Sequence, residues 1–264
     1  MNLKFAEQFK LFINPYYWRS AVLIASCGVA RQYRNSFLGA LWLLLPSIAM
    51  MCIYTLIMPT IMHSDPRTYA TYLLATLPLW TFLSVSLSSS TYSLIANAET
   101  LKRCMISSSV FPVADILKNA YSYMVGFIGM AVIALLIGLP LSWHVFLLPL
   151  YFIPVLLTVM CLCVGIAYVV PYVQDLKDAI IIAMNMLIWV SAVLYPITML
   201  PAKAQKIMEW NPLYILLEPS ITLVYRQQIP DAFVLLKLWI VMCLSLAFGY
   251  TLYRIGGRNY VYYL

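Results

Sequence analysis

Side chains that usually carry out catalysis or hold metals are sparse in this sequence. The two histidines, His63 and His144, fall at the ends of apolar segments, so the buried His or His/Glu cluster of an intramembrane acyltransferase or metalloprotease is absent. Cys161 and Cys163 are two residues apart, and on a helix their sulfurs would point to different sides. Residues 256–258 lack the Gly-Lys-Ser/Thr element that holds nucleotide phosphates. The sequence therefore predicts no catalytic residue, no metal site and no cofactor bound by this chain.

Aromatic side chains are frequent instead, and several fall within long apolar segments. The chain has 20 Tyr and 7 Trp, many of them near segment ends, as in the aromatic belts of membrane proteins. We expect Trp80, Tyr151 and Trp189 to lie deeper, where their faces can stack on sugar rings while offering a hydrogen bond. Together with Tyr195 and Trp210 they are the predicted lining of a substrate path. Ordinary belts and packing are the alternative explanation.

A few polar side chains interrupt the apolar segments. Residues 84–93 are rich in Ser and Thr, which favour close helix packing and can equally line a wet path. Asp115 and Lys118 are three residues apart, so we expect them to pair on one helix face. Lys237 lies near the end of the last apolar segment, where its ammonium group can reach the membrane surface. None of the expected transmembrane spans has a central acidic residue, which argues against a proton-coupled transporter.

The composition predicts an integral membrane protein. Of 264 residues, 64% are apolar and only 9% are charged, whereas soluble domains carry roughly 25% charged residues. Lipid must therefore solvate much of the surface. The net charge of +7 is explained by basic residues in cytoplasmic loops, because no soluble domain is left to present a basic face to nucleic acid.

The apolar segments predict an all-α fold with about six transmembrane helices in one domain, residues 1–264. Residues 1–36 form a cytosolic N-terminus with an amphipathic helix at the membrane interface, residues 37–195 hold spans one to five, and residues 232–264 hold the last span and a tail. The expected spans are residues 37–61, 69–95, 110–139, 145–170, 179–195 and 232–253.

Residues 196–231 differ from a simple loop. They contain five prolines and an apolar stretch too short to cross a bilayer, which predicts re-entrant outer helices that act as a gate. A surface helix lying in the outer headgroups is the alternative. With the N-terminus inside, inner segments carry ten Lys and Arg and outer segments four, so we expect both termini in the cytosol.

A series of short motifs resembles the permeases of polysaccharide-exporting ATP-binding-cassette transporters, among which the O-antigen permeases of Gram-negative bacteria are most similar. Capsule and teichoic-acid permeases are near relatives. The tail after Arg258 departs from the family because it lacks a basic, phenylalanine-rich sequence, so no tail contact carries over. The motifs that carry the resemblance, in chain order, are residues 31–42 with Leu45-Pro46, Asn97, Leu101-Lys102, Phe111-Pro112, Asp175-Leu176-Lys177, Leu194-Tyr195-Pro196 and Asn211-Pro212-Leu213.

The resemblance implies a transport subunit of the bacterial inner membrane that is not itself an enzyme. Its implied partners are a second copy of itself, membrane lipid, and two copies of an ATPase subunit that binds ATP and Mg²⁺. The implied cargo is a glycan linked to undecaprenyl pyrophosphate, and Arg31 and Arg34 suit its pyrophosphate, although anchoring to the inner leaflet explains them equally well. Residues 96–109 are expected to form a coupling helix on the ATPase, with Asn97, Glu99, Leu101, Lys102 and Arg103 at the contact.

Two other functions stay open at this point. A permease for a drug or a small lipid would share the same architecture. A membrane enzyme acting on lipid-linked substrates would need a carboxylate cluster or a histidine placed for catalysis at the membrane surface, and we find neither, because His63 and His144 stand alone at the outer ends of spans.

Overall fold

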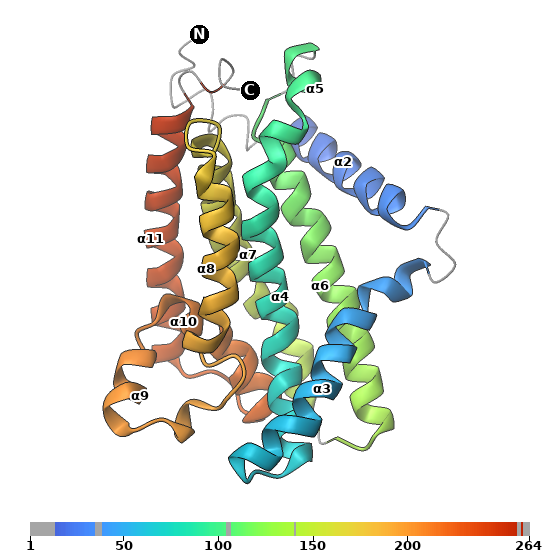
Figure 1. The fold of residues 1–264 in the computed structure, drawn as a ribbon, viewed down its shortest axis with the longest axis vertical. Helices are drawn as coiled ribbons and strands as arrows, with labels where there is room; N and C mark the ends of the chain where they lie inside the picture. Colours follow the sequence, from blue (N-terminus) through green and yellow to red (C-terminus); the bar gives the residue numbers. More distant parts are fainter. Residues whose placement is uncertain (1–13, 35–38, 104–106, 140, 258–259, 261–264) are drawn as a thin grey trace.

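The protein is a bundle of long helices. The computed structural model describes residues 14–34, 39–103, 107–139, 141–257 and 260, and these contain helices and turns but no strand. In Figure 1, α4 runs through the middle of the bundle, α5 projects from one end, and α9 lies at the other. We call these the α5 end and the α9 end. The elements are α2 (Pro15–Tyr33), η1 (Gly39–Leu43), α3 (Leu45–Met62), α4 (Pro66–Ala96), α5 (Ala98–Arg103), α6 (Val110–Leu136), η2 (Trp143–Leu147), α7 (Leu148–Val169), α8 (Asp175–Val190), η3 (Ile197–Met199), α9 (Ala202–Met208), α10 (Pro212–Ser220), the π-helical turn η4 (Ile221–Tyr225) and α11 (Ala232–Gly256).

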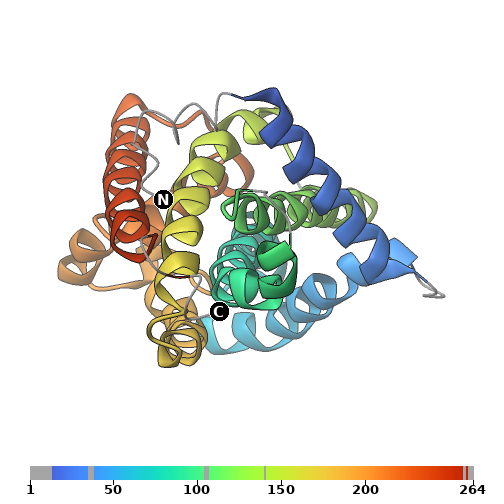
Figure 2. The ribbon, with the colours of Figure 1, turned by 90° about the horizontal axis from the view of Figure 1, so that it is seen from above.

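The helix lengths confirm an all-α membrane protein. Among the described residues, α3, α4, α6, α7 with η2, and α11 are long and apolar enough to cross a bilayer. The predicted fifth span corresponds to α8, which has 16 residues and a length of about 24 Å. Views along and across the bundle place α8 beside α4 (Figures 1 and 2). The backbone beyond α8 continues toward the α9 end as a turn.

The first span begins later than predicted. The expected helix over residues 37–61 starts at Leu45 in the structure, after the short helix η1. Gly39 has a φ of +48°, a left-handed conformation that glycine tolerates, and Pro46 lies in the first turn of α3. The apolar composition is continuous across this break, so hydropathy alone did not reveal it.

An Asx-Pro pair starts three of the helices. In each, the Asn or Asp side chain accepts a hydrogen bond from a backbone amide two or three residues later, and the proline that follows needs no such partner. The pairs are Asn14-Pro15 for α2, Asp65-Pro66 for α4 and Asn211-Pro212 for α10, with bond lengths of 3.0, 2.9 and 3.0 Å. These caps fix where the chain enters α2, α4 and the re-entrant helix.

Glycines bring α7 and α11 into close contact. A Cβ atom on Gly249 would overlap the carbonyl group of Cys161, and one on Gly165 would lie 2.8 Å from the carbonyl oxygen of Gly249. Small residues at such positions let two membrane helices approach closely and gain van der Waals contact. The last span is therefore packed directly against α7.

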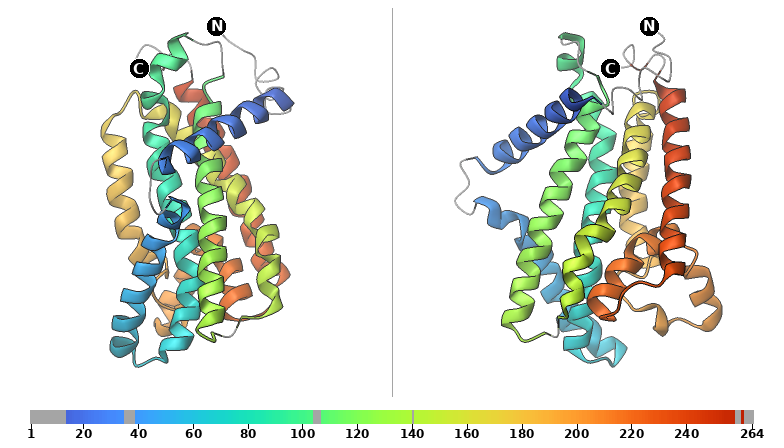
Figure 3. Two further views of the ribbon diagram at one scale, coloured as in Figure 1. Left: turned by 90° about the vertical axis from the view of Figure 1, so that its right-hand side faces the viewer. Right: turned by 180° about the vertical axis from the view of Figure 1, so that it is seen from behind.

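Helix α2 lies obliquely across the outside of the bundle (Figure 3). Tyr17, Ala21 and Ala25 are its buried residues, and it packs against α6. The stem of Lys118 passes over Gly28, where an added Cβ would meet the lysine Cδ at 3.4 Å. Lys118 forms no ion pair with Asp115 within the described residues, so the predicted local pair is wrong.

Candidate functional site

The segment of residues 196–231 divides into an exposed part and a buried part. Most of α9 is exposed at the α9 end, whereas every residue from Tyr214 to Val224 is buried. Helix α10 and η4 insert among α4, α7 and α11. The sequence left two alternatives for residues 196–231, re-entrant helices or a surface helix, and each is found in one part of the segment. Helix α10 with η4 is re-entrant, and α9 lies on the surface.

Side chains of α4 satisfy the irregular backbone just after α8. The hydroxyl of Tyr69 donates to the carbonyl of Leu194 at 2.8 Å, and Thr76 donates to the carbonyl of Val193 at 2.8 Å. The single hydroxyl proton of Tyr72 is shared between the carbonyls of Ala192 and Tyr195. Non-helical backbone buried at this depth requires such partners, because no lipid can supply them. Hydrogen bonds from α4 to these four consecutive carbonyls therefore hold the turn against α4.

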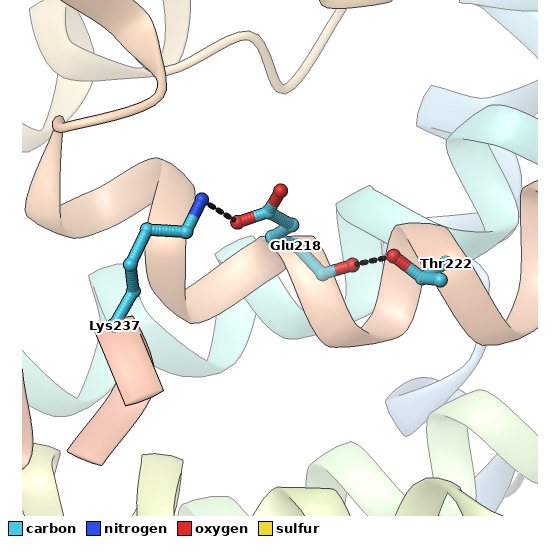
Figure 4. A network of polar contacts seen from close by, with 3 residues as sticks. All are labelled: Glu218, Thr222 and Lys237. Atoms are coloured by element: carbon cyan, nitrogen blue, oxygen red, sulfur yellow. Dashed lines mark hydrogen bonds and ion pairs between the residues drawn. The ribbon is translucent and has the colours of Figure 1, made fainter. Parts of the chain in front are cut away.

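A buried ion pair joins the re-entrant helix to the last span (Figure 4). Lys237 Nζ of α11 lies 2.7 Å from Glu218 Oε2 of α10, and the two side chains are only 5% and 8% exposed. Lys237 also lies over the ring of Phe233, 5.3 Å from its centroid. The prediction that Lys237 reaches the membrane surface is wrong, because its ammonium group turns inward to the carboxylate.

Glu218 was not among the residues predicted from the sequence. The signal was present, since Glu218 is an acidic residue within an apolar stretch, and such residues in membrane segments are paired or functional as a rule. Thr222 caps the same turn by donating to the Glu218 carbonyl at 2.8 Å (Figure 4). Glu218 is thus held by both its side chain and its backbone.

Three of the five predicted path aromatics lie near one another. Tyr195 donates its hydroxyl to the carbonyl of Trp189 at 2.6 Å, and Asn211 donates to the carbonyl of Val190 at 3.3 Å. Trp189 and Trp210, the neighbours of these contacts, are 52% and 66% exposed. Trp189, Tyr195 and Trp210 thus belong to neighbouring parts of the chain where α8 ends and the outer segment begins.

The other two predicted path residues lie apart from this group. Trp80 is buried in the core of the bundle. Tyr151 lines a cavity of about 10 Å³ together with Tyr123, Phe152 and Ser220. The hydroxyl of Tyr123 is buried there with no hydrogen-bond partner among the described residues, and a cavity of this size has room for about one water molecule.

The hydroxyl-rich part of α4 is divided between two faces. Asn119 of α6 donates to Ser86 at 3.3 Å and to Ser89 at 3.2 Å, so that side packs against protein. Thr81, Ser84 and Ser88 follow at helical spacing on another side and are exposed or half-buried.

Near the middle of α4, the exposed Thr81 and the half-buried Ser84 and Ser88 thus share one side of the helix with the exposed Val85, and the Thr81 hydroxyl donates to the Leu77 carbonyl at 2.8 Å. Tyr92, which follows Ser88 by one turn, lies 5.9 Å from Lys177 Nζ at the start of α8, so this side of α4 is turned toward α8. Helix α8 also exposes Asn185 in its second half. We call Thr81, Ser84 and Ser88 the polar face.

Helix α3 also packs against α4, to the right of it in Figure 1, whereas α8 lies to the left. Only 6% of the residues of α3 are buried within the chain. Met50, Ile53, Leu56 and Ile57 are among its large exposed side chains. The polar face thus lies between two poorly covered helices, α3 and α8.

Comparison with known proteins identifies the fold as that of a transporter. The sequence model of the ABC-2 type transporter family matches residues 11–225, which include the polar face and the re-entrant helix. The chain belongs to this family. It is similar to the O-antigen export system permease protein RfbA of Myxococcus xanthus, with 23% identity over 203 residues, 76% of this chain and 78% of that protein. An RfbA protein of Klebsiella pneumoniae is 24% identical over 200 residues, 75% of this chain and 77% of its own length.

Because the chain belongs to this family, the expected coupling segment, residues 96–109, is of interest, and α5 is its helix at the α5 end of the bundle. Glu99 and Arg103 form an exposed ion pair at 3.6 Å, Lys102 is exposed, and none of the six residues of α5 is buried. Asn97 ends α4 by donating to the Ser93 carbonyl at 2.8 Å. Within the expected coupling segment, residues 104–106 lie outside the described residues, and the described helix is Ala98–Arg103.

The remaining predicted residues lie on the surface or beside α5. Leu101 is half-buried against a small apolar cluster formed by Leu94, Ala167 and Tyr168. Arg31, in the last turn of α2, and Arg34, which follows it, are both exposed. No group of three or more His, Cys, Asp or Glu that could hold a metal ion occurs among the described residues.

Proposed function

We propose that this chain is the membrane subunit of an ATP-binding-cassette transporter that exports a polysaccharide linked to undecaprenyl pyrophosphate across the bacterial inner membrane. The RfbA relatives, named as O-antigen export permeases, support the choice of cargo. ATP and Mg²⁺ belong to a separate ATPase subunit, of which two copies bind. The α5 end faces the cytosol, and both termini lie on that side.

The polar face is the observation that carries the proposal. Hydroxyl and amide groups exposed to lipid are costly, so they are found where a second protein surface or water covers them. A second copy of this chain, seated across α3 and α8, would cover those helices and place two polar faces opposite each other. The path between the two copies would then be polar and lined by side chains that bind sugar hydroxyls weakly.

The ends of this path have features that fit a lipid-linked glycan. Trp189, Tyr195 and Trp210 lie at its outer end, where aromatic faces can stack on successive sugar rings. Arg31 and Arg34 are exposed and offer guanidinium groups to a pyrophosphate. The exposed charges of α5 are available to an ATPase surface on the cytosolic side.

A thiol-labelling experiment tests the proposal. Ser88→Cys is introduced into a variant lacking the six native cysteines, produced together with its ATPase and a lipid-linked glycan. We expect a charged, water-soluble thiol reagent to modify Ser88→Cys and stop export. The control is Ile128→Cys, on the exposed surface of α6, which faces lipid and should neither react nor affect export. An unreactive Ser88→Cys in an exporting transporter would contradict a wet path along the polar face.

The cargo is tested separately. Proteoliposomes with the subunit and its ATPase should hydrolyse ATP faster when undecaprenyl-pyrophosphate glycan is added. Stimulation by small drugs or by phospholipid alone, without a response to the glycan, would favour the alternative permease. Conversion of the lipid-linked glycan without ATP would point to a membrane enzyme.

A further inference from the structure

Three consecutive serines, residues 107–109, directly precede α6, and two of their hydroxyls meet tyrosines from three other parts of the chain. Tyr17 of α2 donates to Ser109 at 3.1 Å. Ser108 shares a hydrogen bond of 2.5 Å with Tyr168 of α7 and accepts another of 2.8 Å from Tyr260 in the tail. Ser107 lies 3.0 Å from Ser109. We call Tyr17, Ser107, Ser108, Ser109, Tyr168 and Tyr260 the hydroxyl cluster.

Burial protects these hydrogen bonds from competition by water. Tyr17, Ser108, Ser109 and Tyr168 are all less than 9% exposed, so water does not compete freely for their hydroxyls. Burial raises the pKa of Tyr17 to about 12, while the hydrogen bond with Ser109 acts in the opposite direction. Tyr17 therefore stays a neutral donor at any physiological pH.

The tyrosine rings hold the cluster in place. Tyr168 packs edge-on against Tyr253 of α11 at 4.7 Å between ring centroids and against Tyr260 at 5.0 Å. Such edge-to-face contacts are directional and fix the orientation of the ring. The Tyr168 hydroxyl is thus aimed at Ser108 by its neighbours, so that α6, α7, α11 and the tail meet at one point.

Helix α5 has few other contacts with the bundle. None of its residues is buried, and only Leu101 packs against the apolar cluster around Tyr168. A force applied to α5 therefore reaches the bundle mainly through its ends. The α4 end is capped within its own helix by Asn97, whereas the serine end branches to α2, α7 and the tail.

We propose that the hydroxyl cluster transmits movement of α5 to α2, with Tyr17 and Ser109 as the positioning residues of this connection. The inference rests on the proposed function, in which an ATPase acts on α5. Movement of the serines shifts the Tyr17 hydroxyl, and with it the buried face of α2. Because α2 leads into η1 and α3, the ATPase step is thereby connected to the helix that flanks the polar face.

The test uses the complete transporter in lipid nanodiscs. Tyr17→Phe removes one hydroxyl and leaves the ring in place. The matched control is Tyr253→Phe, because the Tyr253 ring packs in the same region but its hydroxyl makes no hydrogen bond among the described residues. Spin labels at Leu23→Cys on α2 and Ile128→Cys on α6, both exposed positions, report the distance between the two helices with and without ATP.

We expect ATP to change this distance in the otherwise unmodified transporter and in Tyr253→Phe, and to change it much less in Tyr17→Phe. Glycan-stimulated ATP hydrolysis and export should fall about 2- to 10-fold in Tyr17→Phe, the equivalent of one buried hydrogen bond. Basal hydrolysis and thermal stability should stay close to those of the control. Ser109→Ala removes the acceptor from the other side and should reproduce the effect if Tyr17→Phe folds poorly.

The results that would contradict the proposed connection can be told apart from those that would contradict the proposed function. If Tyr17→Phe and Ser109→Ala behave like Tyr253→Phe, the cluster only packs the α5 end and transmits nothing. The same holds if ATP leaves the distance between α2 and α6 unchanged in a transporter that exports. If the unmodified chain neither binds an ATPase nor responds to glycan, the proposed function fails first, and the connection fails with it.

Discussion

Breaking the buried pair between Glu218 and Lys237 should destabilise the protein strongly. The two charged atoms are 2.7 Å apart, and both side chains are less than 9% exposed. At an effective dielectric constant of about 20, unit charges at that distance attract by about 6 kcal/mol. Each ion also lost several kcal/mol of hydration when it was buried, so a single remaining ion has the cost without the attraction.

The expected magnitudes differ sharply between single and double variants. Glu218→Leu and Lys237→Met should each lower the free energy of unfolding by about 3–5 kcal/mol. The double variant replaces the pair by apolar side chains of similar size, and it should lie within about 1 kcal/mol of the parent or exceed it. The strong non-additivity is the signature of a direct contact.

Reversible unfolding in mixed micelles with increasing dodecyl sulfate, followed by tryptophan fluorescence and circular dichroism, measures these differences. Glu209→Leu and Lys206→Met are the matched controls, because both residues lie on exposed positions of the same outer segment. Each should cost less than about 0.5 kcal/mol. If Glu218→Leu costs as little as Glu209→Leu, or if the double variant is as unstable as the sum of the singles, the pair does not hold α10 to α11.

Three further changes test other contacts in the bundle. Gly249→Leu should cost about 1–3 kcal/mol or prevent folding, because its side chain meets the Cys161 backbone, and the yield of folded protein in detergent measures this. Tyr72→Phe leaves buried carbonyls after α8 without a donor and should cost about 1–3 kcal/mol in the same unfolding assay; an unchanged stability would show that water replaces the hydroxyl. Hydrogen bonds from Thr68 hold the pKa of Asp65 below its usual value, so the charged cap stabilises the fold above the unfolded-state pKa, and this stabilisation is lost as pH falls through the folded-state pKa. Asp65→Asn keeps the cap and should flatten that part of the stability–pH curve, and an unaltered curve would assign the pH dependence to another group.

Composition and hydropathy were sufficient to predict the membrane bundle, because lipid exposure demands long apolar helices whatever their packing. They also located the outer segment, where prolines interrupt an apolar stretch. The start of the first span was wrong because η1 and α3 have the same apolar composition on both sides of the break.

Contacts between helices were harder to foresee. Glu218 and Lys237 are 19 residues apart on different helices, and Tyr260 and Ser108 are 152 apart, so no local pattern joins them. Trp80 is buried because α4 is central, and an aromatic residue on a central helix has the same sequence pattern as one on a path. The polar face needed the helix arrangement, since only packing against α6 separates Ser86 from Ser88.

The ion pair also constrains the order in which this chain can be assembled. The ribosome delivers Glu218 before Lys237, so for a time the carboxylate of α10 has no cation to meet. Burying it alone would be costly, so α10 is expected to stay in the outer headgroups until α11 has been inserted. The re-entrant helix would then take its place only after the last span arrives. A chain truncated before α11 would keep five inserted helices, α3, α4, α6, α7 and α8, but its α10 would have no partner. We expect membrane proteases to cleave such an outer segment.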